Sequence, residues 1–203
     1  VEAIIGQPIS WLKQVHGIRV LDLDETHPDT DASRGTNRHA PSPEPQPHAQ
    51  GTSAGADMLP ATDSPVPEPE ADAQITTRPG IALAVQVADC LPVLFCHQSG
   101  NVVAAAHAGW RGLAGGILQN TVRAMGVPAH EIMAYLAPAI GAESFEVGGD
   151  VQAAFCAPNP AAQSCFAPLG NGKYLADIYG LARQILQQTG VSRIYGGDFC
   201  TVK

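Results

Sequence analysis

Residues 26–70 divide the chain into two unequal parts, and this division is the feature that most limits how the chain can fold. The segment carries nine of the seventeen prolines, has no aromatic residue and no isoleucine, and sets seven acidic residues against two arginines. It has too little apolar surface to offset the conformational entropy lost on ordering. We therefore expect a disordered, Pro-rich acidic insertion at residues 26–70, inside a single domain that spans residues 1–203.

The charge balance and the cysteine content exclude several classes of protein. Eleven Lys and Arg against nineteen Asp and Glu give a formal net charge of -8, the wrong sign for a broad nucleic-acid-binding surface. No apolar run is long enough to cross a bilayer, and no basic segment followed by an apolar one begins at Val1, so we expect neither a membrane partner nor an export signal. The five cysteines form no C-x-x-C pair, which favours free thiols or metal ligands in a reducing compartment and predicts a cytoplasmic protein. They are Cys90, Cys96, Cys156, Cys165 and Cys200.

Outside the insertion, short apolar runs separated by turn residues predict buried strands. These runs lie at residues 18–23, 81–87, 91–96 and 102–106. Apolar residues at helical spacing predict one helix that runs from Leu113 to Met125 and another that opens near Asp177 and ends at Gly190. Groups of strands with helices between them favour an α+β layered domain over a doubly wound parallel sheet.

The runs at 91–96 and 102–106 suggest a hairpin that brings a cysteine and a histidine together. If the hairpin turns through residues 97–100, Cys90 lies opposite His107, with Cβ atoms about 4.5–5.5 Å apart. That is close enough for both to hold one zinc ion, at about 2.3 Å from sulfur and about 2.0–2.1 Å from nitrogen. A turn tightened to residues 99–100 would shift the register by two residues and weaken this pairing. Because side chains alternate between the faces of a strand, His97 points away from the face of Cys90 and is excluded as a ligand.

Each of these residues also has a purely structural interpretation. Cys90 is equally well explained as a small buried apolar residue, and His107 as a histidine whose hydrogen bonds are satisfied at a strand end. His16 is the third candidate ligand, since it precedes the predicted first strand and neighbours Gly17, which permits close backbone approach. The alternative for His16 is simple packing beside Trp11.

A series of motifs resembles the YfiH family, also called the laccase-domain or polyphenol-oxidase family. They are Gln14-Val15-His16-Gly17, Ala71-Asp72-Ala73, Ala88-Asp89-Cys90-Leu91-Pro92-Val93, Ala106-His107-Ala108-Gly109-Trp110-Arg111-Gly112, Pro138-Ala139-Ile140-Gly141 and Asp198-Phe199-Cys200-Thr201. The resemblance implies a zinc site formed by His16, Cys90 and His107, and a layered α/β/β/α sandwich. It also implies activity on purine nucleosides: phosphorolysis of adenosine, inosine or methylthioadenosine, and deamination of adenosine.

The chain departs from the family pattern at several places. The long insertion between His16 and Asp72 is unusual, Ala137 stands where the family tends to have Gly, and Phe145 stands where Tyr is common. Family sequence before Val1 and after Lys203 also has no counterpart here. These departures bear on the walls of the substrate pocket more than on the three predicted metal ligands.

Three protein ligands leave one tetrahedral position open, which is typical of a catalytic zinc ion. Such an ion lowers the pKa of a bound water to about 7 and can supply hydroxide for attack at purine C6. Phosphorolysis also needs an anion site, for which Arg111 is the candidate because a guanidinium at a helix start favours phosphate; a surface salt bridge is its alternative. Asp89 is a candidate proton carrier, or an acceptor of a hydrogen bond from a ligand histidine. Gln14 is a candidate contact for the edge of the base.

Other functions fit parts of the same pattern. Some family members were described as copper-dependent phenol oxidases, and two His with one Cys suit a copper centre. However, no methionine is evidently placed as an axial ligand, and the sequence has no H-x-H motif. Cys90 and His107 could instead form the nucleophile and base of a thiol hydrolase, in keeping with the peptidoglycan-precursor editing that the resemblance also implies. A metal-stabilised binding domain without catalytic activity is the non-enzymatic alternative. The sequence does not define the oligomeric state.

Overall fold

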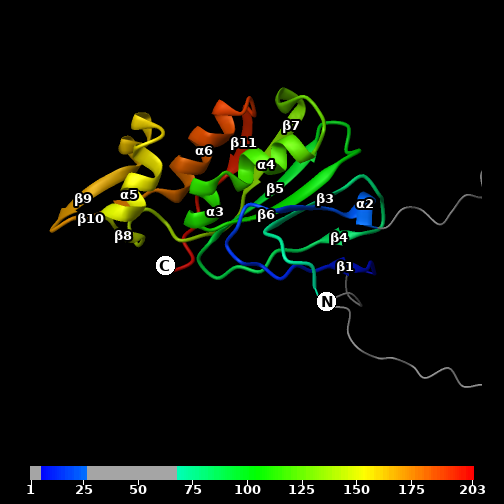
Figure 1. Cartoon of the computed structure of the whole chain (residues 1–203), viewed down its shortest axis with the longest axis horizontal. Helices are drawn as coiled ribbons and strands as arrows, with labels where there is room; N and C mark the ends of the chain where they lie inside the picture. The colour runs from blue at the N-terminus through cyan, green and yellow to red at the C-terminus, as the bar shows by residue number, and fades with distance from the viewer. Residues whose placement is uncertain (1–5, 27–67) are drawn as a thin grey trace, which may run out of the picture. The chain divides into compact units, whose positions relative to one another are not determined.

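The largest sheet of the described residues has six strands, and one of them carries the candidate ligand His107 (Figure 1). The computed structural model describes residues 6–26 and 68–203, so most of the predicted disordered insertion lies outside the described residues. The strand order is β11-β7-β5-β6-β3-β2, with β11–β7 and β2–β3 parallel and the other pairs antiparallel. The strands are β2 (Val20–Asp22), β3 (Ala73–Thr76), β5 (Leu91–His97), β6 (Val103–Ala108), β7 (Ile132–Leu136) and β11 (Arg193–Gly196).

The hairpin predicted at the centre of the sheet is present, but its predicted register is wrong. His107 pairs with Pro92, and Leu91 pairs with Ala108, so Cys90 does not lie directly opposite His107. The turn begins one residue later than expected, because the amide of His97 still donates to the carbonyl of Val102. A shift of two residues preserves the alternation of faces, so Cys90 and His107 keep the same face of the sheet.

The two faces of the sheet differ in what covers them. One face carries the main hydrophobic core, to which β5 and β6 contribute Val93, Phe95, Ala104 and Ala106. The helices lie on this face: α4 (Ile117–Ala124) packs on β6, β3 and β2 and lies beside α6 (Ile178–Gln188), as Figure 1 shows. The small alanine side chains of β6 leave room for these helices, whose apolar stripes complete the core.

The opposite, outer face is covered over part of its width by a pair of short strands, β1 (Ile9–Ser10) and β4 (Ala82–Leu83). Gln74 on β3 is fully buried and donates from Nε2 to the carbonyls of Ser10 and Ala84, which ties this pair to the sheet. Farther along the outer face, Leu94 and Tyr135 remain 45% and 42% exposed. The cover over β3 and β6 therefore forms one wall beside the end of β6, where His107 lies.

The predicted helices are present, with one interruption. The first is split into α3 (Trp110–Gly115) and α4, because Gly116 adopts φ 106, a left-handed conformation that ends one helix and starts the next. The second is confirmed as α6, and Asp177 caps it by accepting from the amide of Gly180. Two predicted strands are shorter than expected, since 18–23 gives β2 followed by α2 (Leu23–Thr26), and 81–87 gives only β4.

A second, three-stranded sheet lies beside α5 at one end of the described unit (Figure 1). Its order is β8-β10-β9, and neither it nor its helices had been predicted from the sequence. Its elements are β8 (Glu146–Gly148), α5 (Gly149–Cys156), the 3-10 helix η2 (Pro160–Cys165), β9 (Phe166–Gly170) and β10 (Lys173–Ala176), and the 3-10 helix η1 (Ala129–Glu131) precedes β7.

The expected fold class is confirmed, since helices and a largely antiparallel sheet combine in one α+β domain. Among the described residues, no helix is both long enough and apolar enough to cross a membrane.

Candidate metal centre

His107, on β6, and Asp72, directly before β3, are neighbours on the outer face of the sheet. The register Ala73↔Ala106 continues by one residue, and the amide of His107 donates to the carbonyl of Asp72 over 2.7 Å. The side chains meet as well, because Nδ1 of His107 lies 2.8 Å from Oδ1 of Asp72. A carboxylate can only accept, so Nδ1 carries the proton and Nε2 keeps a free lone pair. His107 is thereby fixed in the tautomer that can bind a metal through Nε2.

The same carboxylate holds the loop that carries His16. Oδ1 of Asp72 accepts from the amide of His16 over 2.9 Å, and Oδ2 accepts from the amides of Gly17 and Val15 over 2.7 Å and 3.2 Å. These three successive donors explain how His16 is held at φ 60, a left-handed conformation that costs a residue other than glycine about 1 kcal/mol or more. Asp72 is fully buried and thus positions both histidines.

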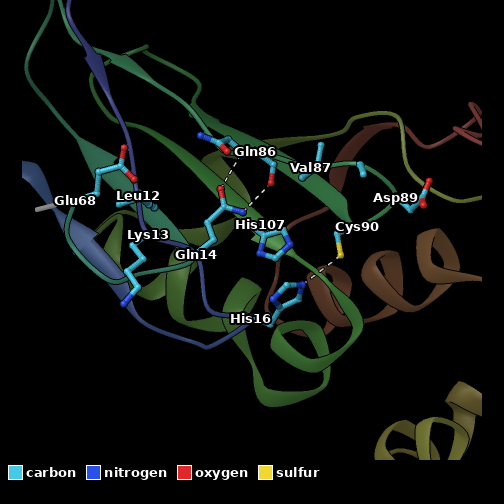
Figure 2. A pocket seen from close by; sticks show the side chains of 11 residues that line it. Leu12, Lys13, Gln14, His16, Glu68, Gln86, Val87, Asp89, Cys90 and His107 are labelled. Atoms are coloured by element: carbon cyan, nitrogen blue, oxygen red, sulfur yellow. Dashed lines mark hydrogen bonds between the residues drawn. The ribbon is translucent and has the colours of Figure 1, made fainter.

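Cys90 completes a group of three donors that come from distant parts of the sequence. Its Sγ lies 3.8 Å from Nε2 of His16, and one ligand atom each from His16, Cys90 and His107 all lie within 4.8 Å of one another. Figure 2 shows the three side chains turned toward a common point. The two imidazole rings meet edge to face, with centroids 4.6 Å apart.

The donor types fit a zinc ion, and the distance between Sγ of Cys90 and Nε2 of His16 is near that of a zinc site. Tetrahedral coordination at the usual bond lengths places sulfur and nitrogen about 3.5 Å apart, slightly closer than the observed 3.8 Å. One thiolate and two imidazoles also suit copper, so the donor types alone do not select the metal.

Gly109 lies directly against the side chains of the three candidate ligands. A Cβ atom at this position would lie 2.9 Å from Sγ of Cys90, 3.0 Å from Cδ2 of His16 and 3.5 Å from Nε2 of His107. The backbone of Gly109 has φ -58 and ψ 157, which any residue can adopt. The glycine is therefore required by the space that the donors occupy and not by its backbone conformation.

The surroundings of the three donors shift the pKa values of Cys90 and Asp72 in opposite directions. Burial raises the pKa of the Cys90 thiol, and the negative charges of Asp89 and Asp72 raise it further. Burial alone would raise the pKa of Asp72, but hydrogen bonds from His107 and from the amides of residues 15–17 hold it below its ordinary value. At neutral pH the site thus combines an ionised Asp72 with a protonated Cys90 in the absence of a cation.

The three donors lie in the wall of a cavity of about 740 Å³. Gln14, Gln86, Asp89 and Lys13 line the same cavity, which falls in the size range of small-molecule sites. The two histidines and Cys90 thus lie where a bound molecule could reach the open coordination position.

The other predicted site residues, Gln14, Asp89 and Arg111, each have a different environment. Gln14 lines the cavity, but its Nε2 donates to the carbonyl of Gln86 over 2.7 Å and its Oε1 accepts from the amide of Gln86 over 2.6 Å. Asp89 points away from the three donors in Figure 2 and accepts from the hydroxyl of Thr201 over 2.7 Å. Arg111 is exposed, stacks over the Trp110 ring at 4.4 Å and is not among the described residues that line the cavity.

Two residues of the site were missed by reasoning from the sequence. The role predicted for Asp89, to accept a hydrogen bond from a ligand histidine, is performed by Asp72. An acid directly before one strand and a histidine near the end of the adjacent strand form a usable signal, but only once the pairing of β3 with β6 is known. Gly109 could not be recognised, because its importance depends on side chains from three separate segments.

Comparison with known proteins identifies the family. The family model described as multi-copper polyphenol oxidoreductase laccase matches residues 2–203, and the relatives include proteins named YfiH. The chain belongs to this YfiH, or laccase-domain, family.

Individual relatives carry more specific names. The chain is 42% identical over 193 residues to a protein of Pseudomonas aeruginosa named purine nucleoside phosphorylase, which covers 95% of this chain and 63% of the relative. It is 52% identical over 147 residues to purine nucleoside phosphorylase YfiH of Escherichia coli, covering 72% of this chain and 60% of the relative. The chain thus spans less than two thirds of the length of these relatives.

Solved structures agree with the fold. A protein of Neisseria meningitidis superimposes with a TM-score of 0.76 at 45% identity, covering 99% of this chain and 67% of that one. YlmD from Geobacillus stearothermophilus superimposes with a TM-score of 0.74 at 25% identity, covering 98% and 67%.

Proposed function

We propose that this chain carries the metal centre of a zinc-dependent purine nucleoside phosphorylase. The observation that carries the proposal is the convergence of His16, Cys90 and His107 in the wall of a cavity of about 740 Å³. Two relatives named purine nucleoside phosphorylase support the substrate class. A zinc ion held by these residues supplies a Lewis acid with one open position and a bound water of pKa about 7.

The residues of the chain have distinct tasks in this proposal. His16 and His107 offer Nε2, and Cys90 offers its sulfur as a thiolate. Asp72 holds both histidines by the hydrogen bonds described above. Arg111, at the start of α3 and two residues from Gly109, is the proposed contact for the phosphate anion, and its exposed guanidinium must then leave the Trp110 ring. Asp89 is the proposed proton carrier on the cavity wall.

The reaction to test is phosphate-dependent cleavage of the glycosidic bond. A phosphate oxygen attacks C1′ of the ribose, the bond from C1′ to the base nitrogen breaks, and a proton passes to the departing base. The products are the free base and ribose 1-phosphate or, from methylthioadenosine, adenine and methylthioribose 1-phosphate.

The assay uses zinc-quantified protein with adenosine, inosine and methylthioadenosine, each with and without phosphate. We expect base and sugar phosphate together, and only when phosphate is present. Release of base in water alone would contradict the proposal. Absence of any turnover, while a full-length YfiH relative is active under the same conditions, would contradict it for this chain.

Adenosine deamination is the second proposed activity, since the open coordination position would be available to water as well as to phosphate. Formation of inosine from adenosine without phosphate tests it. Polyphenol oxidation by a copper-loaded centre is a third candidate, favoured by the family description and the donor types. Protein produced without added copper should not oxidise phenols if zinc is the resident metal.

The thiol hydrolase alternative is less well supported by the site. A cysteine nucleophile requires a lowered pKa, whereas burial and two neighbouring carboxylates raise the pKa of Cys90. The imidazole whose nitrogen contacts Sγ at 3.8 Å is that of His16 and not that of His107, which is the base of the predicted dyad. These contacts favour a thiol that ionises on binding a cation.

A further inference from the structure

The two histidines and the cysteine of the metal centre are held by different means. Asp72 bonds to the backbone of His16 and to the ring of His107, so one buried carboxylate positions both. Cys90 receives no hydrogen bond from Asp72 among the described contacts. It lies in residues 84–90, which connect β4 to β5 without strand or helix pairing of their own.

This connection is tied to the loop of His16 by one side chain. The carboxamide of Gln14 forms a reciprocal pair with the backbone of Gln86, donating over 2.7 Å and accepting over 2.6 Å. Figure 2 shows this pair between the His16 loop and the segment that leads to Cys90. The carboxamide thus makes the same two hydrogen bonds to Gln86 that a backbone residue of a paired strand would make, one as donor and one as acceptor.

The far end of the connection is tied to other elements. The carbonyl of Asp89 accepts from the amide of Ile140 over 2.9 Å, and the Asp89 side chain accepts from the hydroxyl of Thr201. Cys90 therefore lies beside a short span with one anchor at Gln86 and another at Asp89. Leu91, which follows Cys90, pairs with Ala108 and so ties the cysteine to β6 and His107. The Gln86 anchor links the span to the loop of His16, since Gln14 is two residues from His16.

We infer that Gln14 is a positioning residue that sets the approach of the Cys90 sulfur to the imidazole of His16, in place of the contact with a base edge expected from the sequence. The inference rests on the proposed metal centre. Outer contacts of this kind change metal affinity by about 10–100-fold. Loss of the pair should let the sulfur move away from Nε2 of His16, while Asp72 keeps the two histidines together.

Cobalt substitution separates the sulfur ligand from the nitrogen ligands. Cobalt bound to thiolate gives a near-ultraviolet charge-transfer band, whereas imidazole ligands contribute only to the weaker visible bands. For the whole chain loaded with cobalt, we expect the wild type to show both. Gln14→Leu should lose most of the charge-transfer band, retain visible bands and bind cobalt about 10–100-fold more weakly.

The chain offers a matched control and a milder variant. Gln86→Ala removes a cavity-lining side chain but leaves the amide and carbonyl that Gln14 binds, so its cobalt spectrum should equal that of the wild type. Gln14→Glu keeps the size of the side chain and its acceptor but sets an oxygen against the Gln86 carbonyl, so its charge-transfer band should weaken. It serves as the test if Gln14→Leu, without metal, melts well below the wild type.

The possible results distinguish the positioning role of Gln14 from the proposed metal centre on which it rests. A full charge-transfer band in both Gln14 variants would overturn the positioning role and leave the metal centre intact. A wild type without this band would overturn the metal centre and the inference together. A Gln86→Ala spectrum as altered as that of Gln14→Leu would show that the cavity wall, and not the backbone pair, determines the geometry.

Discussion

Oδ1 of Asp72 accepts hydrogen bonds from Nδ1 of His107 over 2.8 Å and from the amide of His16 over 2.9 Å. One atom thus joins two histidines that are 91 positions apart, since 107 − 16 = 91. The contact orients the ring of His107 and holds the backbone of His16 in a strained conformation. One buried carboxylate therefore fixes the relative placement of the two candidate ligand histidines.

Replacing Asp72 by Asn should therefore weaken the centre without altering any ligand. The amide nitrogen of Asn would face a backbone N–H or the ring N–H, so at least one donor is left without an acceptor. We expect zinc affinity to fall about 10–100-fold and the unfolding free energy to fall by about 1–3 kcal/mol. Zinc competition titration and denaturant unfolding of the metal-free protein measure the two effects.

The pH dependence of stability gives an independent check on Asp72. Its folded-state pKa is lowered, so its contribution is fully present above the ordinary carboxyl pKa and is lost as pH falls through the folded-state value. The Asn variant should lack this part of the acid sensitivity. Parallel acid unfolding curves for the two proteins would contradict the ionised state assigned to Asp72.

Gly109→Ala should abolish tight metal binding by filling the space where the donors meet. The added Cβ would lie 2.9 Å from the sulfur of Cys90, so the ligands must separate. Its backbone conformation is open to alanine, and the metal-free protein should therefore fold. Gly149→Ala is the control, because the nearest atom to its new Cβ is 3.8 Å away. Equal zinc binding by both variants would show that the three donors do not share one ion.

Metal binding should release a proton from Cys90. Burial and the charges of Asp89 and Asp72 raise its pKa, so the thiol is protonated at pH 7 in the metal-free protein. Apparent zinc affinity should therefore rise about tenfold per pH unit on account of this group alone. Calorimetry in buffers of different ionisation enthalpy counts the protons, and Cys90→Ser should release one fewer.

The alkylation rate of Cys90 in the metal-free protein tests whether the pKa of its thiol is raised. Cys200 is the internal comparison, since hydrogen bonds from the amides of Val202 and Gly141 lower its pKa. We expect Cys200 to react with iodoacetamide at pH 7.5 well before Cys90. Faster reaction at Cys90 would favour the alternative in which Cys90 is the nucleophile of a thiol hydrolase.

Arg111→Gln tests the predicted contact between Arg111 and the phosphate anion. If the guanidinium leaves Trp110 to bind phosphate, KM for phosphate should rise severalfold, while zinc content and KM for the nucleoside remain as in the wild type. An unchanged KM for phosphate would identify the stacked arginine as a surface feature.

The sequence predicted the residue types of the site better than their geometry. Strand alternation correctly placed Cys90 and His107 on one face and His97 away from it, because a period of two survives a two-residue shift in register. The register itself depends on which turn closes the hairpin, and local sequence allowed two. The register that formed continues the hairpin pairing to His97 and Val102.

Long-range contacts account for what could not be foreseen. Asp72 meets His107 only because β3 pairs with β6, although β4 and β5 lie between them in the sequence, and nothing local encodes this pairing. The split between α3 and α4 was readable in principle, since Gly115-Gly116 interrupts the helical run. The second sheet was missed because its strands are short and only partly buried.

Quantification of metal in the purified chain tests the central claim most directly. Plasma emission analysis should find about one zinc per chain in the wild type, and little in His107→Ala or Cys90→Ala with folding preserved. Zinc-free wild-type protein that also fails to take up added zinc or copper, or full zinc retention by both variants, would contradict the account.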